Sequence, residues 1–356
     1  MVHGGAMIPH NRPLITNEDR AAVDSVLRSG WVAQGSQVQT LERSFVSHYR
    51  GGEACAVSSG TAALFLTLKG LGIKAGDKVA LPTYACSALL NAVYMAGAMP
   101  IIVDVLPDSF CLDPVALERQ AIDAACVIAV HTYGESADIA GMLHSSRKLI
   151  EDCCQSLGGE GPQGLLGNAG DAAVFSFYAT KIITGGQGGL VWANDPALAD
   201  AVRDYRQFDC RKNYVPRFNL QMTDIQAALI NSQMGRLEEI RARRQGIAKR
   251  YLAALPQGLA VQSGLTDVGR MVYRFVVVPP DRASCDALHR HMEKAGVSCA
   301  VPIQRYELLH RYLKLDPTDF PLAERLVDTT LSLPIHPSLS ETQVEQVAEV
   351  LERFRL

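Results

Sequence analysis

Short apolar segments alternate with helical stretches through the larger, N-terminal part of the chain. Several of these segments are apolar almost throughout, which is typical of strands covered on both faces. Strands that alternate with helices in this way predict an α/β fold with a mainly parallel sheet. The expected strands cover residues 54–57, 78–81, 99–105, 126–131, 148–152, 172–177 and 189–193.

Two helices are expected ahead of the first strand. Thr16 and Asp19 have the spacing of a capping box, in which a hydroxyl and a carboxylate three residues later bind each other's backbone amides. The box predicts a helix that runs to about Arg28 and is ended by Gly30. A second helix is expected over residues 37–49, and a third over residues 62–71, after the first strand.

The C-terminal part of the chain has a different pattern. One long helix is expected over about residues 224–253, leading away from the parallel sheet. One clear strand follows at residues 271–278, with helices near residues 285–295 and 341–354. We interpret this part as a smaller α+β domain and predict a large domain over residues 8–235 and a small domain over residues 236–356.

Composition places the 356-residue chain among ordinary globular proteins, with 48% apolar and 20% charged residues. A net charge of −3 without a run of Lys and Arg gives no basic surface for nucleic acid. The longest apolar runs, such as residues 125–130, are too short to cross a bilayer. No secretory signal is recognisable, and residues 1–6 are expected to be a disordered lead-in. We therefore expect neither a nucleic-acid partner nor a membrane.

The nine cysteines are irregularly spaced and include no C-x-x-C pair, so neither a disulfide framework nor a metal site is expected. Free thiols of this kind fit a reducing cytoplasm. The adjacent Cys153 and Cys154 suggest a redox pair, but small buried hydrophobic residues are the better interpretation.

The turn Ser59-Gly60-Thr61 lies between an expected strand and an expected helix. Free backbone amides and the helix dipole favour an anion there, Gly60 permits close approach, and the Thr61 hydroxyl adds a donor. Small residues at such a turn are also simply good helix caps. By itself the turn is weak evidence for a phosphate site.

Glu151 and Asp152 end another expected strand, where ligands of parallel α/β sheets gather. A carboxylate at that place can hold a protonated pyridine nitrogen. Gln155, three residues later, can return to the same site. The competing interpretation, favoured when Asp152 is considered alone, is that its carboxylate caps a following helix.

Lys181 follows the expected strand 172–177 in the segment Ser176-Phe-Tyr-Ala-Thr-Lys181, ahead of a cluster of glycines. Desolvation of a lysine beyond a buried strand promotes loss of its proton, as a Schiff-base nucleophile requires. The alternative is an ordinary surface lysine. No Gly-x-Gly-x-x-Gly sequence opens an early strand-helix unit, which counts against a dinucleotide fold.

Together these three segments predict one ligand that carries a phosphate, a cationic ring nitrogen and a carbonyl. Pyridoxal 5′-phosphate (PLP) has all three groups. The combination is much more specific than any of its parts.

The same segments resemble the nucleotide-sugar aminotransferases of the DegT/StrS group, within the fold-type I PLP-dependent enzymes. The resemblance covers nearly the whole chain, with its motifs in the family's order and spacing. It rests on Ile8-Pro-His-Asn-Arg-Pro13, Gly30-Trp-Val-Ala-Gln-Gly35, Ser59-Gly-Thr-Ala-Ala-Leu64, Glu151-Asp-Cys-Cys-Gln155, Phe175-Ser-Phe-Tyr-Ala-Thr-Lys181 and Leu331-Ser-Leu-Pro334.

The resemblance implies a role for each matching residue. Lys181 would form the Schiff base with PLP and move protons between substrate and cofactor. Asp152 would pair with the pyridine nitrogen, and Gln155 would lie near the ring or its phenolic oxygen. The phosphate would be bound by Gly60, Thr61 and Ser176.

Three further residues are implied outside this group. Asn219 matches a position that reaches the cofactor of a neighbouring subunit, which implies a homodimer with shared active sites. Trp31 and Tyr178 match positions that line the sugar pocket.

The chain also departs from the family's pattern. Cys86 stands where an aromatic residue often covers the PLP ring, so either Tyr84 takes over the stacking or Cys86 packs there. Gln187 replaces a common Glu, and Gln221 a common Arg. A frequent His-Tyr pair is replaced near residues 300–302, so the exact sugar stays open.

The resemblance implies a PLP-dependent aminotransferase that converts a nucleotide-linked keto-sugar to an amino-sugar, with glutamate as amino donor. Some relatives carry His in place of the lysine and act as sugar dehydratases, and Lys181 argues against that branch. Three alternatives remain: an aminotransferase for a keto-cyclitol or another secondary-metabolite ketone, a non-catalytic regulatory protein with the same fold, and an NAD-dependent sugar enzyme.

Overall fold

The computed structural model describes residues 7–144 and 147–356, and the interpretation of residues 1–6 lies outside this part. Its main element is a seven-stranded sheet in the order β1-β9-β8-β5-β4-β2-β3. Because β9 pairs antiparallel with both β1 and β8, it alone runs against the other strands, and the predicted mainly parallel sheet is confirmed. The strands are β1 (Glu53–Val57), β2 (Lys78–Pro82), β3 (Met99–Val103), β4 (Cys126–Val130), β5 (Lys148–Asp152), β8 (Ala172–Ser176) and β9 (Gly189–Ala193).

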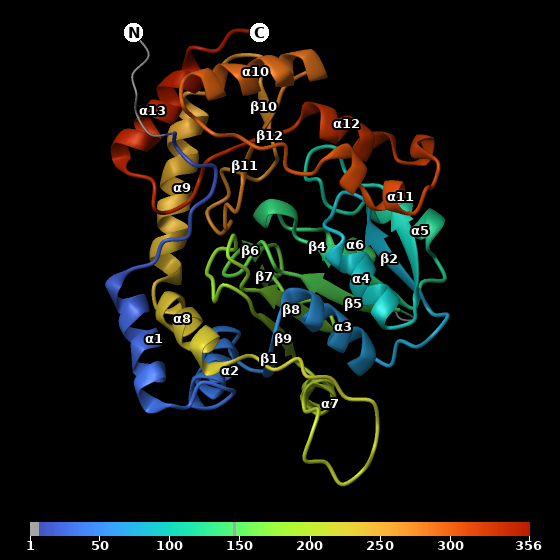
Figure 1. Cartoon of the computed structure of the whole chain (residues 1–356). Helices are drawn as coiled ribbons and strands as arrows, with labels where there is room; N and C mark the ends of the chain where they lie inside the picture. Colours follow the sequence, from blue (N-terminus) through green and yellow to red (C-terminus); the bar gives the residue numbers. More distant parts are fainter. Residues whose placement is uncertain (1–6, 145–146) are drawn as a thin grey trace.

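Both faces of this sheet are covered, which explains why several of its strands are apolar almost throughout. In β4, Cys126, Ile128 and Val130 belong to one hydrophobic core, whereas Val127 and Ala129 between them belong to another. Helices α3 (Gly60–Gly70), α4 (Ala88–Met95) and α7 (Pro196–Arg206) cover the first face. The opposite face is covered by α2 (Ser36–His48), α5 (Pro114–Gln120), α6 (Ile139–Met142) and α8 (Asp224–Met234) (Figure 1).

The first helix, α1 (Asn17–Ser29), begins as predicted. Thr16 and Asp19 form the reciprocal capping box, and Gly30 ends the helix in the left-handed conformation with φ 73°. The start of α2 is held instead by Asp224, whose carboxylate accepts the amides of Gly35, Gln37 and Val38.

The single helix predicted over residues 224–253 is wrong. The structure has α8, which ends at Met234, and a separate α9 (Leu237–Ala253). Arg236 between them leaves the helical region at φ −115° and ψ 15°, next to Gly235, which disfavours an uninterrupted helix. The Arg236 guanidinium is held by Asp19 of α1 at 2.7 Å, so a tertiary ion pair accompanies the break.

The C-terminal part forms the predicted α+β arrangement. An antiparallel sheet of β10 (Ala260–Val261), β11 (Phe275–Val278) and β12 (Leu331–Leu333) packs with α9, α10 (Arg282–Lys294) and α13 (Glu341–Glu352). Figure 1 shows α9 running from the main sheet to this layer. The remaining elements are β6 (Glu160–Gly161), β7 (Gly164–Leu165), α11 (Leu309–Tyr312), α12 (Pro321–Thr329), and the 3-10 turns η1 (Thr132–Gly134), η2 (Arg305–Glu307) and η3 (Pro317–Asp319).

The strand predicted over residues 271–278 begins only at Phe275. The preceding residues bind the rest of the protein instead of a neighbouring strand: Arg244 of α9 donates to the carbonyls of Val272 and Tyr273, each at 3.2 Å. The Tyr273 amide donates to the Tyr133 carbonyl at 3.2 Å. The first half of this apolar run, residues 271–274, therefore contacts other parts of the protein. Only its second half forms a strand.

The first described residues pack against the C-terminal part. Ile8 forms a bridge with Val297 and belongs to the same hydrophobic core as α9, α10 and α13. Within residues 7–144 and 147–356, no helix combines the length and apolarity needed to cross a membrane.

Candidate active site

A cavity of about 350 Å3 lies where parallel strands of the main sheet end. Its walls come from the segments that directly follow β1, β2, β4, β5 and β8, together with residues of the C-terminal part. This is the edge of a parallel sheet at which ligands are expected. The structure brings together at this cavity the predicted residues Gly60, Thr61, Tyr84, Cys86, Asp152, Gln155, Ser176, Tyr178 and Lys181.

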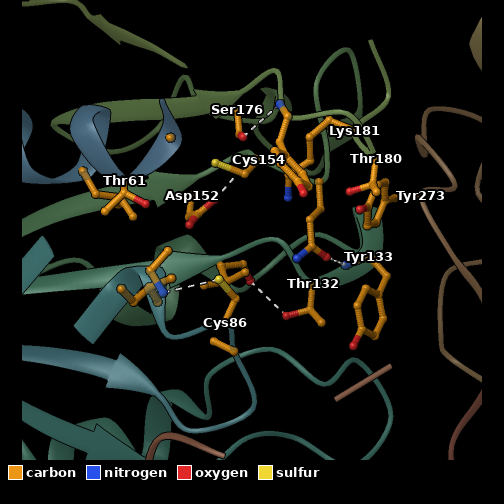
Figure 2. Close-up of a pocket in the computed structure, with 18 of the residues that line it drawn as sticks. Thr61, Cys86, Thr132, Tyr133, Asp152, Cys154, Ser176, Thr180, Lys181 and Tyr273 are labelled. Carbon is orange, nitrogen blue, oxygen red and sulfur yellow. Dashed lines mark hydrogen bonds between the residues drawn. The ribbon is translucent and has the colours of Figure 1, made fainter. Parts of the chain in front are cut away.

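The end of the cavity near Thr61 is suited to an anion. Ser59 caps α3 by accepting the Ala62 amide at 3.1 Å, which leaves the first amides of the helix, those of Gly60 and Thr61, without partners inside the helix. Free amides at a helix N-terminus, with the hydroxyls of Thr61 and Ser176 beside them, form an anion site. Figure 2 shows Thr61 at one end of the cavity and Lys181, Thr180 and Tyr273 grouped at the other.

Gly60 allows this end to close tightly. A Cβ atom at Gly60 would lie 2.9 Å from Ser176 Cβ, closer than side chains approach. We expect Gly60→Ala to displace the phosphate-binding segments and to weaken PLP binding by roughly 10-fold or more, at an overpacking cost of about 1–3 kcal/mol. Titration of the apo-protein with PLP measures this loss.

Gly246→Ala is the matched control for this substitution, because a Cβ at Gly246 meets nothing within 4 Å. It lies inside α9, where alanine favours the helix. Equal PLP affinity of the two variants would show that the close approach at Gly60 has no role in binding.

Asp152 is the last residue of β5, and its carboxylate reaches the cavity. Its Oδ1 accepts the Cys154 amide at 2.9 Å, but a turn follows instead of a helix, so the helix-cap interpretation is wrong. The Gln155 side chain is fixed by the Tyr133 amide, which donates to Oε1 at 2.9 Å. Tyr133 adopts the left-handed conformation with φ 58°, which orients its amide.

Glu151 has a different environment from its neighbour Asp152. His131 Nδ1 accepts the Ala137 amide, so its Nε2–H donates to Glu151 at 2.9 Å. Backbone amides of Gly167, Ala169 and Gly170 donate to the same carboxylate at 2.7–2.9 Å. Burial raises the pKa of Glu151, but the His131 and backbone hydrogen bonds outweigh it and hold the pKa below its ordinary value. The carboxylate thus joins the end of β5 to the loop before β8.

We expect Glu151→Gln to lower the free energy of unfolding by about 3 kcal/mol at pH 7. The glutamine NH2 group is a donor, and it would face buried backbone N–H groups that also need an acceptor. Because the pKa of Glu151 is lowered by folding, its contribution is present above the ordinary value near 4.5 and is lost as the pH falls through the folded pKa. Urea unfolding at several pH values measures both effects. The exposed Glu349→Gln, which loses only an i,i+4 ion pair, is the control, and equal losses in the two variants would contradict the role of Glu151.

Lys181 lies in the loop after β8, where its amide donates to the Tyr178 carbonyl at 2.9 Å. Its Nζ is 5.5 Å from the centroid of the Tyr273 ring. Burial lowers the pKa of Lys181, but interactions with the ionisable groups of Tyr273, Cys154 and Asp152 raise it more, so the net pKa lies above the ordinary value. Desolvation acts on the pKa of Lys181 in the expected direction, but these neighbours outweigh it.

A model described as the DegT/DnrJ/EryC1/StrS aminotransferase family matches residues 13–352. The chain belongs to this family. It is 31% identical to the spore coat polysaccharide biosynthesis protein SpsC of Bacillus subtilis, over 97% of this chain and 96% of that protein. It is 30% identical to a dTDP-3-amino-3,6-dideoxy-alpha-D-galactopyranose transaminase of Aneurinibacillus thermoaerophilus, over 95% of each.

The solved structure of the aminotransferase TlmJ from Streptoalloteichus hindustanus superimposes with a TM-score of 0.88 at 29% identity, over 97% of this chain and 98% of that one. The predicted fold-type I architecture is therefore confirmed. The chain is a PLP-dependent aminotransferase.

The cavity of this DegT/DnrJ/EryC1/StrS aminotransferase fits PLP in its chemistry. The amides and hydroxyls near Gly60 and Thr61 suit the phosphate, the Asp152 carboxylate suits a protonated ring nitrogen, and the Lys181 amine suits the aldehyde. The absence of a Cβ at Gly60 leaves the close approach that the phosphate end needs.

Two of the residues that the resemblance implied do not line this aminotransferase cavity. Trp31 is 62% exposed, and its indole N–H donates to the Gln34 carbonyl at 3.1 Å. Asn219 is exposed between Phe218, whose ring packs on Phe65, and Leu220, whose carbonyl accepts the Ser58 amide. The segment that carries Asn219 thus crosses beside the phosphate loop without entering the cavity.

Tyr84 and Cys86 both line the cavity but differ in burial and in their contacts. Tyr84 is buried, with its hydroxyl 3.2 Å from Thr330 Oγ1 and its ring against Phe110. Cys86 is exposed, and its Sγ accepts the Ala88 amide at 3.3 Å. Which of the two covers the cofactor ring in this aminotransferase stays a prediction.

The adjacent cysteines of the family motif are held as thiols. Burial raises the pKa of both Cys153 and Cys154 well above the ordinary value. Cys153 belongs to a hydrophobic core, and Cys154 packs on another core while lining the cavity. The structure supports hydrophobic packing over a redox pair.

Sequence reasoning missed the wall that the C-terminal part adds to the cavity. Tyr273 and Arg274 lie there with Pro302 and Ile303, so the departure from the family pattern near residues 300–302 is at the cavity itself. Gln187 also lines the cavity, whereas Gln221 does not. The available signal was the polar pair Tyr273-Arg274 inside an otherwise apolar run.

Proposed function

We propose that this enzyme transfers an amino group from glutamate to the ketone of a nucleotide-linked sugar. The observation that carries the proposal is the meeting of Lys181 and Asp152 in one cavity whose far end is built for an anion. The relative from Aneurinibacillus thermoaerophilus is named as a dTDP-amino-sugar transaminase, which supports a nucleotide-linked substrate.

In this proposal the residues of the cavity act on bound PLP and on the substrate as follows. Bound PLP supplies a carbonyl that takes up the amino group and a ring that accepts electrons. Lys181 Nζ holds the aldehyde and then moves the proton at the reacting carbon. Asp152 keeps the ring nitrogen protonated, and Gln155 lies beside the ring. Gly60, Thr61 and Ser176 hold the phosphate.

We also propose a homodimer with shared active sites. Asn219 and Trp31 are exposed and do not line the cavity of their own subunit, which supports their action on a neighbouring subunit, Trp31 at the sugar pocket together with Tyr178. Residues 208–216 are all exposed and lie in the loop that projects beyond α7 (Figure 1). Tyr214 within this loop is 93% exposed, as expected of a segment that lies against a partner.

Two further features belong to the proposal. All nine cysteines are free, which supports a cytoplasmic location. The domain boundary between residues 235 and 236 coincides with the break between α8 and α9, which supports a large domain over residues 8–235 and a small one over 236–356.

The substrate is tested with the pyridoxamine phosphate form of the enzyme. Each of a panel of nucleotide-linked keto-sugars and free keto-cyclitols is added, and return of the PLP spectrum is followed. We expect a nucleotide-linked keto-sugar to restore it and a keto-cyclitol to fail. Restoration by keto-cyclitols alone would overturn the nucleotide-sugar assignment and leave the aminotransferase activity standing.

A further inference from the structure

Three charged residues line the main cavity: Asp152, Lys181 and Arg274. The proposed function uses the first two for the ring nitrogen and the aldehyde. Arg274 is left without a task, although a guanidinium inside a cavity costs free energy unless a counter-charge meets it.

The contacts of Arg274 within the protein are neutral ones. Its Nη1 lies 3.4 Å from both His10 Nε2 and Ser332 Oγ. Its guanidinium carbon is 5.5 Å from the Tyr133 ring centroid and 5.7 Å from that of Tyr273. These contacts fix the direction of the side chain but do not neutralise its charge.

Three of the four buried arginines in the described part of the chain are paired with carboxylates. Among the ion pairs of residues 7–144 and 147–356, none includes Arg274 or the buried Arg244 behind it. The paired examples are Arg147 with Glu118, Arg206 with Glu42 and Arg270 with Glu135. Arg274 at the cavity wall is half-buried, and it shares the lack of a carboxylate partner only with Arg244 behind it among these five described arginines.

A small second cavity behind Arg274 also offers no carboxylate partner for the guanidinium. It is lined by Arg274, Arg244, His10, His336 and neutral groups, with no carboxylate among its described lining residues. Burial, Arg274 and His336 lower the pKa of His10 to about 3, so its ring is neutral. The volume of about 10 Å3 is close to the minimum for one water, so an anion can reach Arg274 only from the main cavity.

We propose that Arg274 binds a carboxylate of the amino donor. The inference rests on the proposed function, in which an amino acid gives its nitrogen at Lys181. Lys181 Nζ and the Arg274 guanidinium both lie within 6 Å of the Tyr273 ring centroid, at 5.5 and 5.7 Å, so the two cations border the same part of the cavity. Thr61, at the anion end, lies on the opposite side of the cavity (Figure 2). An amino acid carries amine and carboxylate close together, which matches this pair of groups.

The test uses the PLP-loaded dimer and its reaction with L-glutamate, followed by the loss of the PLP absorbance. Arg274→Gln removes the charge, Arg274→Lys keeps it, and Arg290→Gln removes an exposed arginine of α10 as the matched control. We expect Arg274→Gln to raise the apparent Kd for glutamate about 100-fold, with Arg274→Lys in between and Arg290→Gln unchanged. PLP affinity, measured separately, stays that of the wild type in all three.

A second probe separates the carboxylate from the chemistry. Succinate has two carboxylates and no amine, so it binds without reacting, and its Kd is measured as competition against glutamate. We expect Arg274→Gln to weaken succinate binding by a factor similar to that for glutamate, which a defect confined to the chemical step does not do.

The outcomes are distinct. Unchanged glutamate and succinate binding in Arg274→Gln overturns the inference and leaves the proposed function standing. UDP serves as a probe for the nucleotide part of the sugar substrate. If Arg274→Gln weakens UDP binding and leaves glutamate binding unchanged, the guanidinium binds the nucleotide-sugar phosphates, and the inference is also overturned. If the wild type itself fails to react with glutamate, the proposed donor is wrong and the inference falls with it.

Discussion

Lys181→Ala is expected to lower the rate of transamination by a factor of about 10⁴ or more, with no measurable turnover. Lys181 is the sole lysine that lines the described cavity, so its amine has no substitute as nucleophile or proton carrier. Single-turnover kinetics with glutamate measures the loss, because one turnover does not depend on knowing the sugar.

The fold of Lys181→Ala is expected to stay intact. The variant loses a cation among Tyr273, Cys154 and Asp152 at the surface of a cavity, and no ion pair or core packing goes with it. Circular dichroism and the unfolding transition check this, with Lys249→Ala on the exposed side of α9 as control. Wild-type turnover in Lys181→Ala would remove the lysine from the mechanism.

Asp152→Asn is expected to lower the same rate by roughly 10³-fold, the usual cost of removing one preorganised electrostatic partner from an active site. The asparagine side chain keeps an oxygen for the Cys154 amide, so the turn after β5 is preserved. What it loses is the negative charge that we propose keeps the cofactor's ring nitrogen protonated.

The absorbance spectrum separates a charge effect at Asp152 from a structural one. We expect Asp152→Asn to bind PLP with a shifted spectrum and to react slowly at every pH. Asp200→Asn, at an exposed position of α7, is the control and should match the wild type. Wild-type rates in Asp152→Asn would mean that the carboxylate does not act on the ring.

The main sheet could be predicted from sequence because its strands are buried on both faces. Burial on both faces makes β4 apolar from Cys126 to Val130, a pattern that does not depend on distant contacts. The capping box of Thr16 and Asp19 was predictable for the same reason, since both partners lie within four residues.

The failures of prediction arose where distant residues decide the local structure. The break between α8 and α9 involves Arg236 held by Asp19, more than two hundred residues earlier. The start of β11 is delayed because Arg244 takes the carbonyls of Val272 and Tyr273. None of these pairings has a signature in the local sequence.

The cavity wall formed by the main sheet could be predicted from sequence, but the wall formed by the C-terminal part could not. Gly60 and Lys181 follow strands of the main sheet, Asp152 ends another, and the carboxyl ends of these strands meet at one edge. Tyr273 and Arg274 reach the same cavity from the C-terminal part, where no strand order predicts their position. The residues alone did not separate Glu151 from the adjacent Asp152. The family resemblance pointed to Asp152, and the structure places Glu151 against His131.

The most direct test of the central claim is the absorbance spectrum of the PLP-loaded protein before and after addition of glutamate. A parallel sample is reduced with borohydride and mapped by peptide mass spectrometry. The predicted result is a visible-edge band that disappears with glutamate and a reduced pyridoxyl group attached to Lys181. The claim is contradicted if the protein binds no PLP after reconstitution. It is also contradicted if glutamate leaves the spectrum unchanged and the pyridoxyl label is found on another lysine.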